Sequence, residues 1–196
     1  EDFSDRPIAL PRNLSAELAI PATFVCADLY TLPSVLTGQF DIVFTSYGVL
    51  CWLLDLLRWA RVIAHFLKPD GAFYIVEFHP FAYVFDDSQE LTELRVSYSY
   101  FHNPEPIEFK VEGSYADPTA TVGQPLSYEW THSLGDIINA LIRAGLRIEF
   151  LHEFPILVDP CILPPALTIR AEDGWYRLKD QDKMIPLMFS LKATKP

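Results

Sequence analysis

The sequence predicts an α/β domain built around a mostly parallel β-sheet, and three observations support that fold class. Apolar runs at residues 22–27, 40–45 and 72–78 have the length and the β-branched and aromatic content of buried strands. A helical repeat occupies residues 53–67, between the second and third runs. Strands that are apolar on both faces and joined by helices are typical of a parallel sheet covered on both sides.

Size and charge exclude several function classes. The chain has 196 residues, half of them hydrophobic, which is enough for one domain with a core that needs no covalent staples. It has 15 basic and 26 acidic residues, a formal net charge of −11, and no run of Lys or Arg. Nucleic acids and anionic membranes attract basic surfaces, so neither is expected as a partner. A small-molecule substrate fits this composition better.

The cysteines and the hydropathy pattern indicate a cytoplasmic protein. Cys26, Cys51 and Cys161 are odd in number and stand among apolar residues, so we expect buried free thiols in a reducing compartment rather than disulfides. No apolar run approaches the ~20 residues that a membrane-spanning helix needs.

The helices of the first half follow from periodicity and turn residues. Residues 6–19 are rich in helix formers, but Pro7 and Pro11 limit the regular part to the later residues. In residues 53–67 apolar side chains recur every three or four positions, which predicts an amphipathic helix. The turn sequence at residues 68–71 should end it before the strand at 72–78.

The pattern changes at residue 80. Residues 80–132 contain no long helical repeat but hold alternating aromatic stretches at 95–101, 107–115 and 125–130, which predict a β-rich insertion or cap. The α/β domain would then comprise residues 1–79 and 133–196. A helix should begin at Ser133, which forms a capping box with Asp136, and Gly145 should end it. Residues 146–154 and 185–193 complete the strands, with a loop of about thirty residues between them.

Several residues with binding chemistry follow the ends of predicted strands. Asp28, Ser46-Tyr47-Gly48 and Glu77-Phe78-His79 each stand at the end of a strand, and Asp2 precedes a helix. Ligands bind beyond the carboxyl ends of the strands in an open parallel sheet. Gly48 would let a ligand lie close to the backbone there.

Four segments together resemble the middle and rear of a class I S-adenosylmethionine-dependent methyltransferase. They are Asp2-Phe3-Ser4, VCADLYTLP at 25–33, FDIVFTSYGVL at 40–50 and LKPDGAFYIVEFHP at 67–80. The resemblance implies a Rossmann-like sheet of strand order 3-2-1-4-5-7-6, with strand 7 antiparallel, and S-adenosylmethionine as the cofactor.

The resemblance also implies roles for individual residues. Asp2 matches the acid that holds the ribose hydroxyls, and Phe3 the apolar residue against adenine. Asp28 matches the residue that meets the adenine amino group, with Leu29 beside the ring. Ser46 and Tyr47 match the segment that passes the methionine part of the cofactor and faces the acceptor.

The sequence departs from the family pattern at its start. The family's glycine-rich loop, its first strand and helix, and most of its second strand are not in this sequence. We therefore expect a further N-terminal segment of roughly 60–80 residues and a piece that is inactive by itself. In an intact fold the strands at 22–27 and 40–45 would stand about 14 Å apart, and about 5 Å apart if they pair directly. Pairing with another copy is also open, so a homodimer is one expected state.

The remaining site candidates concern the methyl acceptor. His79 and His132 could serve as general bases near neutral pH, and Tyr47 lies where the acceptor would be. Glu77, Phe81 and Trp130 are expected to contact the substrate, and no His, Cys, Asp or Glu cluster has metal-ligand spacing. The predicted reaction is methyl transfer to O, N or C of a small molecule. A nicotinamide- or nucleotide-dependent Rossmann enzyme and a non-catalytic methyltransferase-like partner protein are the alternatives.

Overall fold

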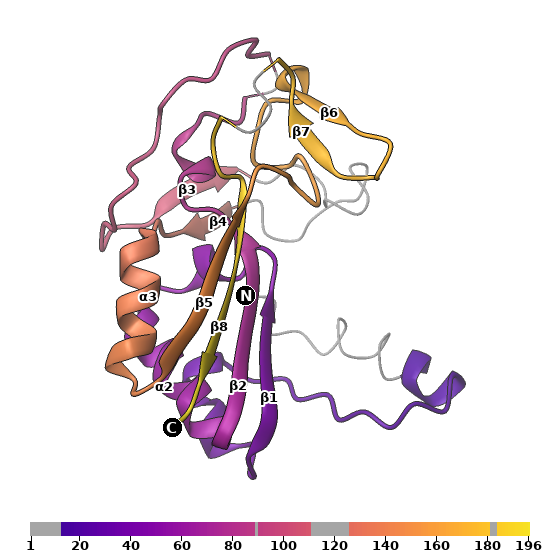
Figure 1. Ribbon diagram of the computed structural model, residues 1–196, viewed down its shortest axis with the longest axis vertical. Helices are drawn as coiled ribbons and strands as arrows, with labels where there is room; N and C mark the ends of the chain where they lie inside the picture. The colour runs from indigo at the N-terminus through magenta and orange to yellow at the C-terminus, as the bar shows by residue number, and fades with distance from the viewer. Residues whose placement is uncertain (1–12, 89, 111–125, 181–183) are drawn as a thin grey trace.

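The chain folds around a four-stranded sheet of order β1-β2-β8-β5 (Figure 1). The computed structural model describes residues 13–88, 90–110, 126–180 and 184–196. The strands are β1 (Phe40–Ser46), β2 (Leu67–Phe78), β8 (Met188–Thr194) and β5 (Arg147–Phe154). β1 and β2 are parallel, whereas β8 is antiparallel to both of its neighbours. This is the predicted 4-5-7-6 order with one reversed strand, so the fold class is confirmed.

Two amphipathic helices cover one face of this sheet. α2 (Leu56–Phe66) begins three residues later than predicted, because η2 (Leu50–Trp52) precedes it and the Asp55 side chain accepts from the Arg58 amide as its N-cap. α3 (Leu134–Arg143) has the predicted capping box at Ser133 and ends as expected, with Gly145 at φ 86°.

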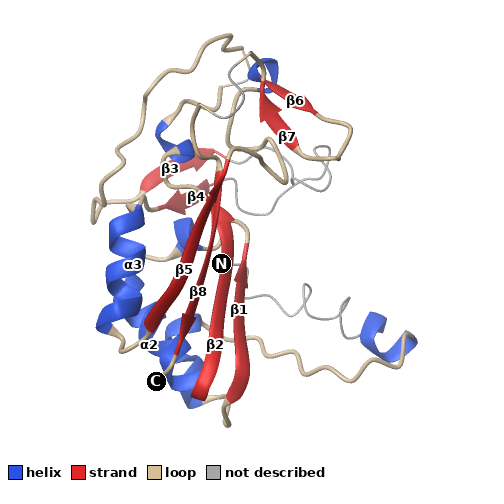
Figure 2. Cartoon of the chain, viewed as in Figure 1, coloured by secondary structure: helices blue, strands red, loops and turns tan. Residues whose placement is uncertain are grey.

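The main core lies between these helices and the sheet. Trp59 of α2 is 1% exposed and meets the ring of Phe73 edge-on, with 5.6 Å between ring centroids. Ile137 and Leu141 of α3 and Leu191 of β8 are completely buried in the same cluster. Figure 2 shows both helices on the same side of the four strands.

The opposite face and the β1 edge are rich in exposed apolar side chains. Phe40, Ile42 and Phe44 alternate along β1 and are 43%, 68% and 57% exposed. Within the described part of the chain, β1 has β2 as its one ladder partner. Phe44 stacks on Tyr74, which in turn contacts Phe150, so an aromatic row crosses this face.

The prediction of a strand at residues 22–27 is wrong. These residues are extended but form no ladder with the described residues, and the chain continues into η1 (Leu29–Ser34). A strand exists only where a neighbour accepts and donates its backbone hydrogen bonds, and no described segment does so here. The distance expected between the strand at 22–27 and β1 therefore cannot be compared with the structure, because only β1 is a strand.

The exposed edge of β1 should drive self-association. Phe44→Lys places a charge in the middle of an apolar strand that has a ladder partner on one side only among the described residues, which is how natural proteins block edge-to-edge pairing. We expect this variant to be more monomeric than the parent chain in sedimentation velocity at matched concentration. Ile142→Lys, on the exposed side of α3 at 52% exposure, is the control and should change little. Equal effects of the two variants would contradict a role for the β1 edge.

Smaller elements gather beyond the carboxyl ends of β1 and β2. Residues 80–132 contribute η3 (Ala82–Val84) and the antiparallel pair β3 (Ile107–Lys110) and β4 (Leu126–Glu129). The predicted strand at 95–101 is reduced to an isolated bridge between Phe85 and Val96, and residues 111–125 lie outside the described residues. The boundaries proposed for this insertion stay a prediction.

The long loop after β5 has structure that the sequence pattern did not indicate. It contains η4 (Pro165–Leu167) and a hairpin of β6 (Thr168–Arg170) and β7 (Tyr176–Leu178). Buried residues of this loop form a second core with Phe78 and η3; they include Leu157, Leu163, Leu178 and Leu187. The three cysteines are free thiols as predicted, but Cys26 and Cys161 are exposed rather than buried.

Candidate functional site

The turn after β1 is held by the side chain of Glu77. One carboxyl oxygen of Glu77 accepts from the Gly48 and Phe78 amides at 2.5 and 2.8 Å, and the other accepts from the Val49 and Leu50 amides at 2.8 and 3.4 Å. The side chain is 2% exposed. Glu77 reaches this position because β2 is parallel to β1, so both strands end at the same edge of the sheet. Its contacts are internal, and its first effect is to fix the backbone of residues 48–50.

The same turn explains the small residues that end β1. Tyr47 and Gly48 have φ values of 30° and 71°, so the chain reverses in a conformation that side chains other than glycine rarely adopt. A Cβ on Gly48 would meet one described atom within 4 Å, a ring carbon of Phe78 at 3.9 Å. Space therefore lies beside this backbone, as expected for a strand end that receives a ligand.

A small pocket lies directly behind this turn. Its volume is about 20 Å³, which accommodates one group the size of a water molecule. The lining side chains come from η2, the end of β2, the insertion and α3; they are Leu50, Cys51, Glu77, Phe78, Pro80, Tyr83, Trp130, Thr131, His132 and Ile137. Three residues expected in the site, Glu77, Trp130 and His132, thus meet here.

The insertion is attached to this edge by specific hydrogen bonds. The Trp130 amide donates to the Cys51 carbonyl at 2.8 Å, and its indole N–H donates to the Pro104 carbonyl at 3.1 Å. His132 Nε2 lies 2.6 Å from the Leu53 carbonyl oxygen. These contacts join β4 and the start of α3 to η2 and close one wall of the pocket.

His132 has the properties of a neutral base. A carbonyl oxygen can only accept, so the proton belongs on Nε2 and the lone pair on Nδ1. Burial, the largest cause, lowers its pKa, and the stacked ring of His102 acts in the same direction. His132 is therefore uncharged at neutral pH.

Ionisable groups in and beside the pocket have raised pKa values. Burial raises the pKa of the Cys51 thiol, and the nearby carboxylates of Glu129 and Glu77 raise it further. The pKa of Tyr83 is raised by burial and by the same two carboxylates, together with Cys51. Burial also raises the pKa of Glu129, whose carboxylate accepts from Ser127 and interacts with the Cys51 thiol.

His79 faces away from this pocket. Its Nδ1 accepts from the Phe81 amide at 3.0 Å, and its Nε2 lies 2.9 Å from a Glu153 oxygen, at ion-pair distance but without the geometry of a hydrogen bond. Burial lowers its pKa more than Glu153 raises it. With both ring nitrogens turned toward protein groups, His79 anchors the end of β2 to β5 and is not placed as a base.

The two buried histidines should make the fold sensitive to mild acid. Because each has a pKa below its value in the unfolded chain, near 6.5, the unfolded state binds more protons as the pH falls. The stability is fully present above about pH 6.5 and is lost progressively below it. Urea unfolding between pH 7.5 and 5 should show this decrease, and the double variant His79→Gln/His132→Gln should flatten it. An unchanged slope in the double variant would assign the effect to other groups.

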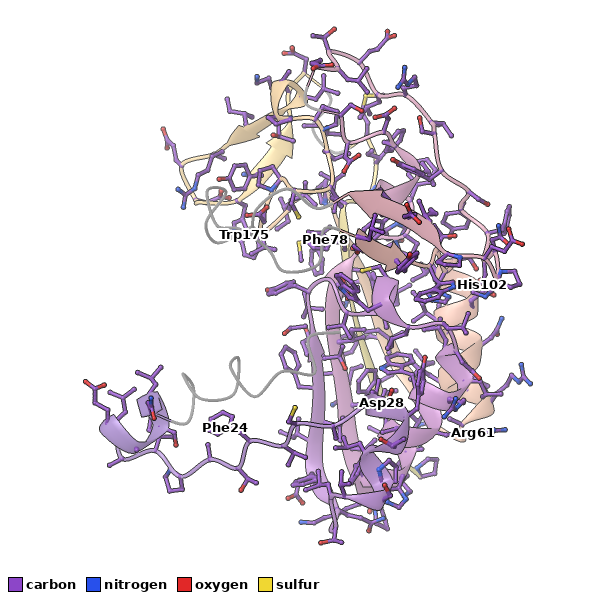
Figure 3. The ribbon with its side chains drawn as sticks, turned by 180° about the vertical axis from the view of Figure 1, so that it is seen from behind. Phe24, Asp28, Arg61, Phe78, His102 and Trp175 are labelled. Atoms are coloured by element: carbon purple, nitrogen blue, oxygen red, sulfur yellow. The ribbon has the colours of Figure 1, made fainter. Side chains whose placement is uncertain are left out.

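The remaining predicted cofactor residues lie beside the turn or outside the described residues. Asp28 caps η1, its carboxylate accepting from the Thr31 amide at 3.1 Å, and Leu29 packs against the main core. η1 is fixed on α2, because Tyr30 Oη accepts from the Asp55 amide and the ring of Tyr30 lies 4.4 Å from the Arg58 guanidinium. Figure 3 shows Asp28 well below Phe78 in the view, away from the pocket.

Ser46 is half-buried and Tyr47 is 43% exposed at the end of β1, but neither lines the pocket. Phe81 is 38% exposed and packs on Phe85 and Tyr100 instead. Asp2 and Phe3 lie outside the described residues.

Sequence reasoning missed Cys51, Tyr83 and Glu129. Cys51 was expected only as a buried free thiol, and the other two stand in segments whose pairing depends on contacts far along the chain. One available signal was that each of these residues is more polar than the apolar or aromatic residues directly beside it. No group of three or more possible metal ligands occurs in the described ranges. None of the described helices is long and apolar enough to cross a membrane.

A protein-family model matches the N-terminal part of the chain. Residues 2–75 match the family model described as a methyltransferase domain. No curated protein matches the chain.

Solved structures show where the same fold occurs. An S-adenosylmethionine-dependent methyltransferase from Mesorhizobium loti is 22% identical, with a TM-score of 0.58 over 99% of this chain and 78% of that chain. One from Clostridium acetobutylicum ATCC 824 is 11% identical, with the same TM-score over 99% and 73%. The glycopeptide N-methyltransferase MtfA is 18% identical, with a TM-score of 0.54 over 98% and 71%. These structures show that the chain has the fold of S-adenosylmethionine-dependent methyltransferases, as the resemblance implied.

Proposed function

We propose that this chain, which has the class I methyltransferase fold and matches the methyltransferase domain model over residues 2–75, takes part in S-adenosylmethionine-dependent methyl transfer to a small molecule. The observation that carries this is the sheet order β1-β2-β8-β5 with β8 reversed, together with the glycine turn at the carboxyl end of β1. A nicotinamide-dependent Rossmann sheet is parallel at the corresponding position, so that alternative is disfavoured.

The described residues fit the methionine side of such a cofactor. The backbone of Gly48 has open space beside it, and Tyr47 projects into solvent at the same strand end. Ser46 and Tyr47 would hold the methionine part of the cofactor. Asp28 would meet the adenine amino group, with Leu29 beside the adenine ring. Asp2 would hold the ribose hydroxyls, and Phe3 would lie against adenine. When bound, S-adenosylmethionine supplies an electrophilic methyl group on a sulfonium.

The chain's own residues would orient the acceptor and take its proton. Trp130, Tyr83 and Phe78 form aromatic walls of the pocket behind the turn, and Glu77 holds the backbone of the turn. Proximity supplies much of the rate in methyl transfer, so this positioning matters for the reaction. Neutral His132 is the group that can accept a proton from an O, N or C acceptor.

A second candidate function, a non-catalytic methyltransferase-like partner protein, is favoured by one observation. The row of exposed apolar side chains on β1 is a surface of the kind that binds other proteins. The two functions differ in whether the turn at Gly48 binds the cofactor, which the next experiment measures.

Asp28→Ala should weaken S-adenosylmethionine binding by about 1–3 kcal/mol, because the adenine amino group would lose its hydrogen-bond acceptor. Tyr47→Phe should leave this affinity unchanged and alter turnover. Titration calorimetry of the chain measures the affinity of both variants, and a methyl-transfer assay measures turnover. Asp70→Ala, in β2 near the end of that strand opposite the candidate site, is the control. Equal affinity of Asp28→Ala and the parent would remove Asp28 from the site.

A further inference from the structure

The pocket behind the β1 turn combines a buried carboxylate with aromatic walls, and its described lining contains no Lys or Arg. Its ten lining residues include Glu77 and three aromatic side chains. A buried negative site faced by π-systems attracts cations, whereas it disfavours anions and gives little to neutral hydroxyl groups.

Glu129 strengthens this potential from the insertion. It precedes Trp130, is half-buried, and interacts with the Cys51 thiol in the pocket wall. Glu77, the carboxylate in the lining, uses both oxygens on four backbone amides. Glu129 lies behind the lining, where it accepts from the Ser127 hydroxyl at 3.3 Å and interacts with the Cys51 thiol. Glu129 therefore keeps capacity to accept from a ligand group seated next to the Cys51 side of the pocket.

Size narrows the group that enters. A volume of about 20 Å³ admits one group the size of water, such as an ammonium head, but not a ring. The rest of such a ligand would lie outside, toward the turn at Gly48.

We infer that this pocket binds the amino group of an amine-bearing acceptor, with Glu129 as its charge partner and Trp130 and Tyr83 as its cation–π walls. This rests on the proposed function for its biological meaning, but the binding itself does not. An ammonium must lose its proton before its nitrogen can accept a methyl group, and neutral His132 lies in the same wall to take it.

Benzylammonium and benzyl alcohol are suitable probes, because they have similar shape and differ in charge. Titration of the full chain, followed by NMR of the backbone amides of residues 48–51 and 130–132, should show saturable binding of benzylammonium and weaker binding of the alcohol. Glu129→Gln should weaken the binding of benzylammonium about tenfold and leave the affinity for benzyl alcohol unchanged.

Glu108→Gln is the matched control, since Glu108 is exposed on the neighbouring strand of the same hairpin, opposite Tyr128. It should behave as the parent chain, and melting temperatures verify that both variants are folded. Equal affinity for the two probes, equal effects of the two variants, or no binding at millimolar probe would overturn the inference. If Glu129→Gln does not fold, the comparison of the two probes on the parent chain decides.

The probes contain no cofactor, so their failure is distinct from failure of the proposed function. If the chain binds S-adenosylmethionine but not benzylammonium, the proposed methyl transfer stands and the amine-binding pocket is overturned. If the chain binds benzylammonium but not S-adenosylmethionine, the amine-binding pocket stands and the proposed use of S-adenosylmethionine is overturned.

Discussion

Glu77→Leu should destabilise the chain by about 3–5 kcal/mol, the largest effect expected from a single change in the candidate site. The side chain is buried and accepts from four backbone amides, and leucine would leave all four without an acceptor. Glu77→Gln keeps one accepting oxygen and should cost less. Denaturant unfolding measures the free energy, and hydrogen exchange at Gly48, Val49 and Leu50 reports the turn itself.

Glu90→Leu and Glu90→Gln, at an exposed loop residue, are the matched controls and should leave stability nearly unchanged. If Glu77→Leu is as stable as these, or if exchange at Gly48–Leu50 is unaltered, the carboxyl group does not hold the turn.

Trp59→Ala should destabilise the chain by a similar amount, about 3–5 kcal/mol. Trp59 is 1% exposed in the centre of α2 and packs against Phe73, so its removal leaves a cavity between the helix and the sheet. Trp52→Ala removes the same side chain from η2, where it is 39% exposed, and should cost much less. Chemical unfolding of both variants provides the comparison. Similar costs would show that α2 does not depend on this contact.

The two main helices could be predicted because their signals are local. The capping box at Ser133, the glycine at 145 and the apolar repeat of α2 each depend on neighbours within one or two turns. The strand order followed from the resemblance, and the structure agrees with it. The hairpin β6–β7 was not predicted, because its three-residue strands are too short to show alternation.

The strand at 22–27 shows where sequence patterns mislead. ATFVCA has strand composition, but composition describes a side-chain surface and not the presence of a hydrogen-bonding neighbour. β1 is a second example. Its apolar side chains, such as Ile42, have the composition of a buried strand, but they lie exposed on a face that no described element covers.

The candidate site was predicted in part for the same reason. Residues that follow strand ends were found, including Glu77, but its direction toward the backbone was not foreseeable from one sequence. Trp130 and His132 reach the pocket through contacts with Cys51 and Leu53, about 80 positions away. His79 was expected at the site from its position alone, and its ring turns toward Glu153 instead.

The central claim is that the turn at the carboxyl end of β1 receives S-adenosylmethionine. The most direct measurement is NMR titration of the chain with S-adenosylmethionine, alongside NADH as the competing cofactor. We expect saturable shifts at Asp28, Ser46, Tyr47 and Gly48 with S-adenosylmethionine, and none there with NADH. No saturable shift at millimolar S-adenosylmethionine, or shifts at these residues with NADH alone, would contradict the account.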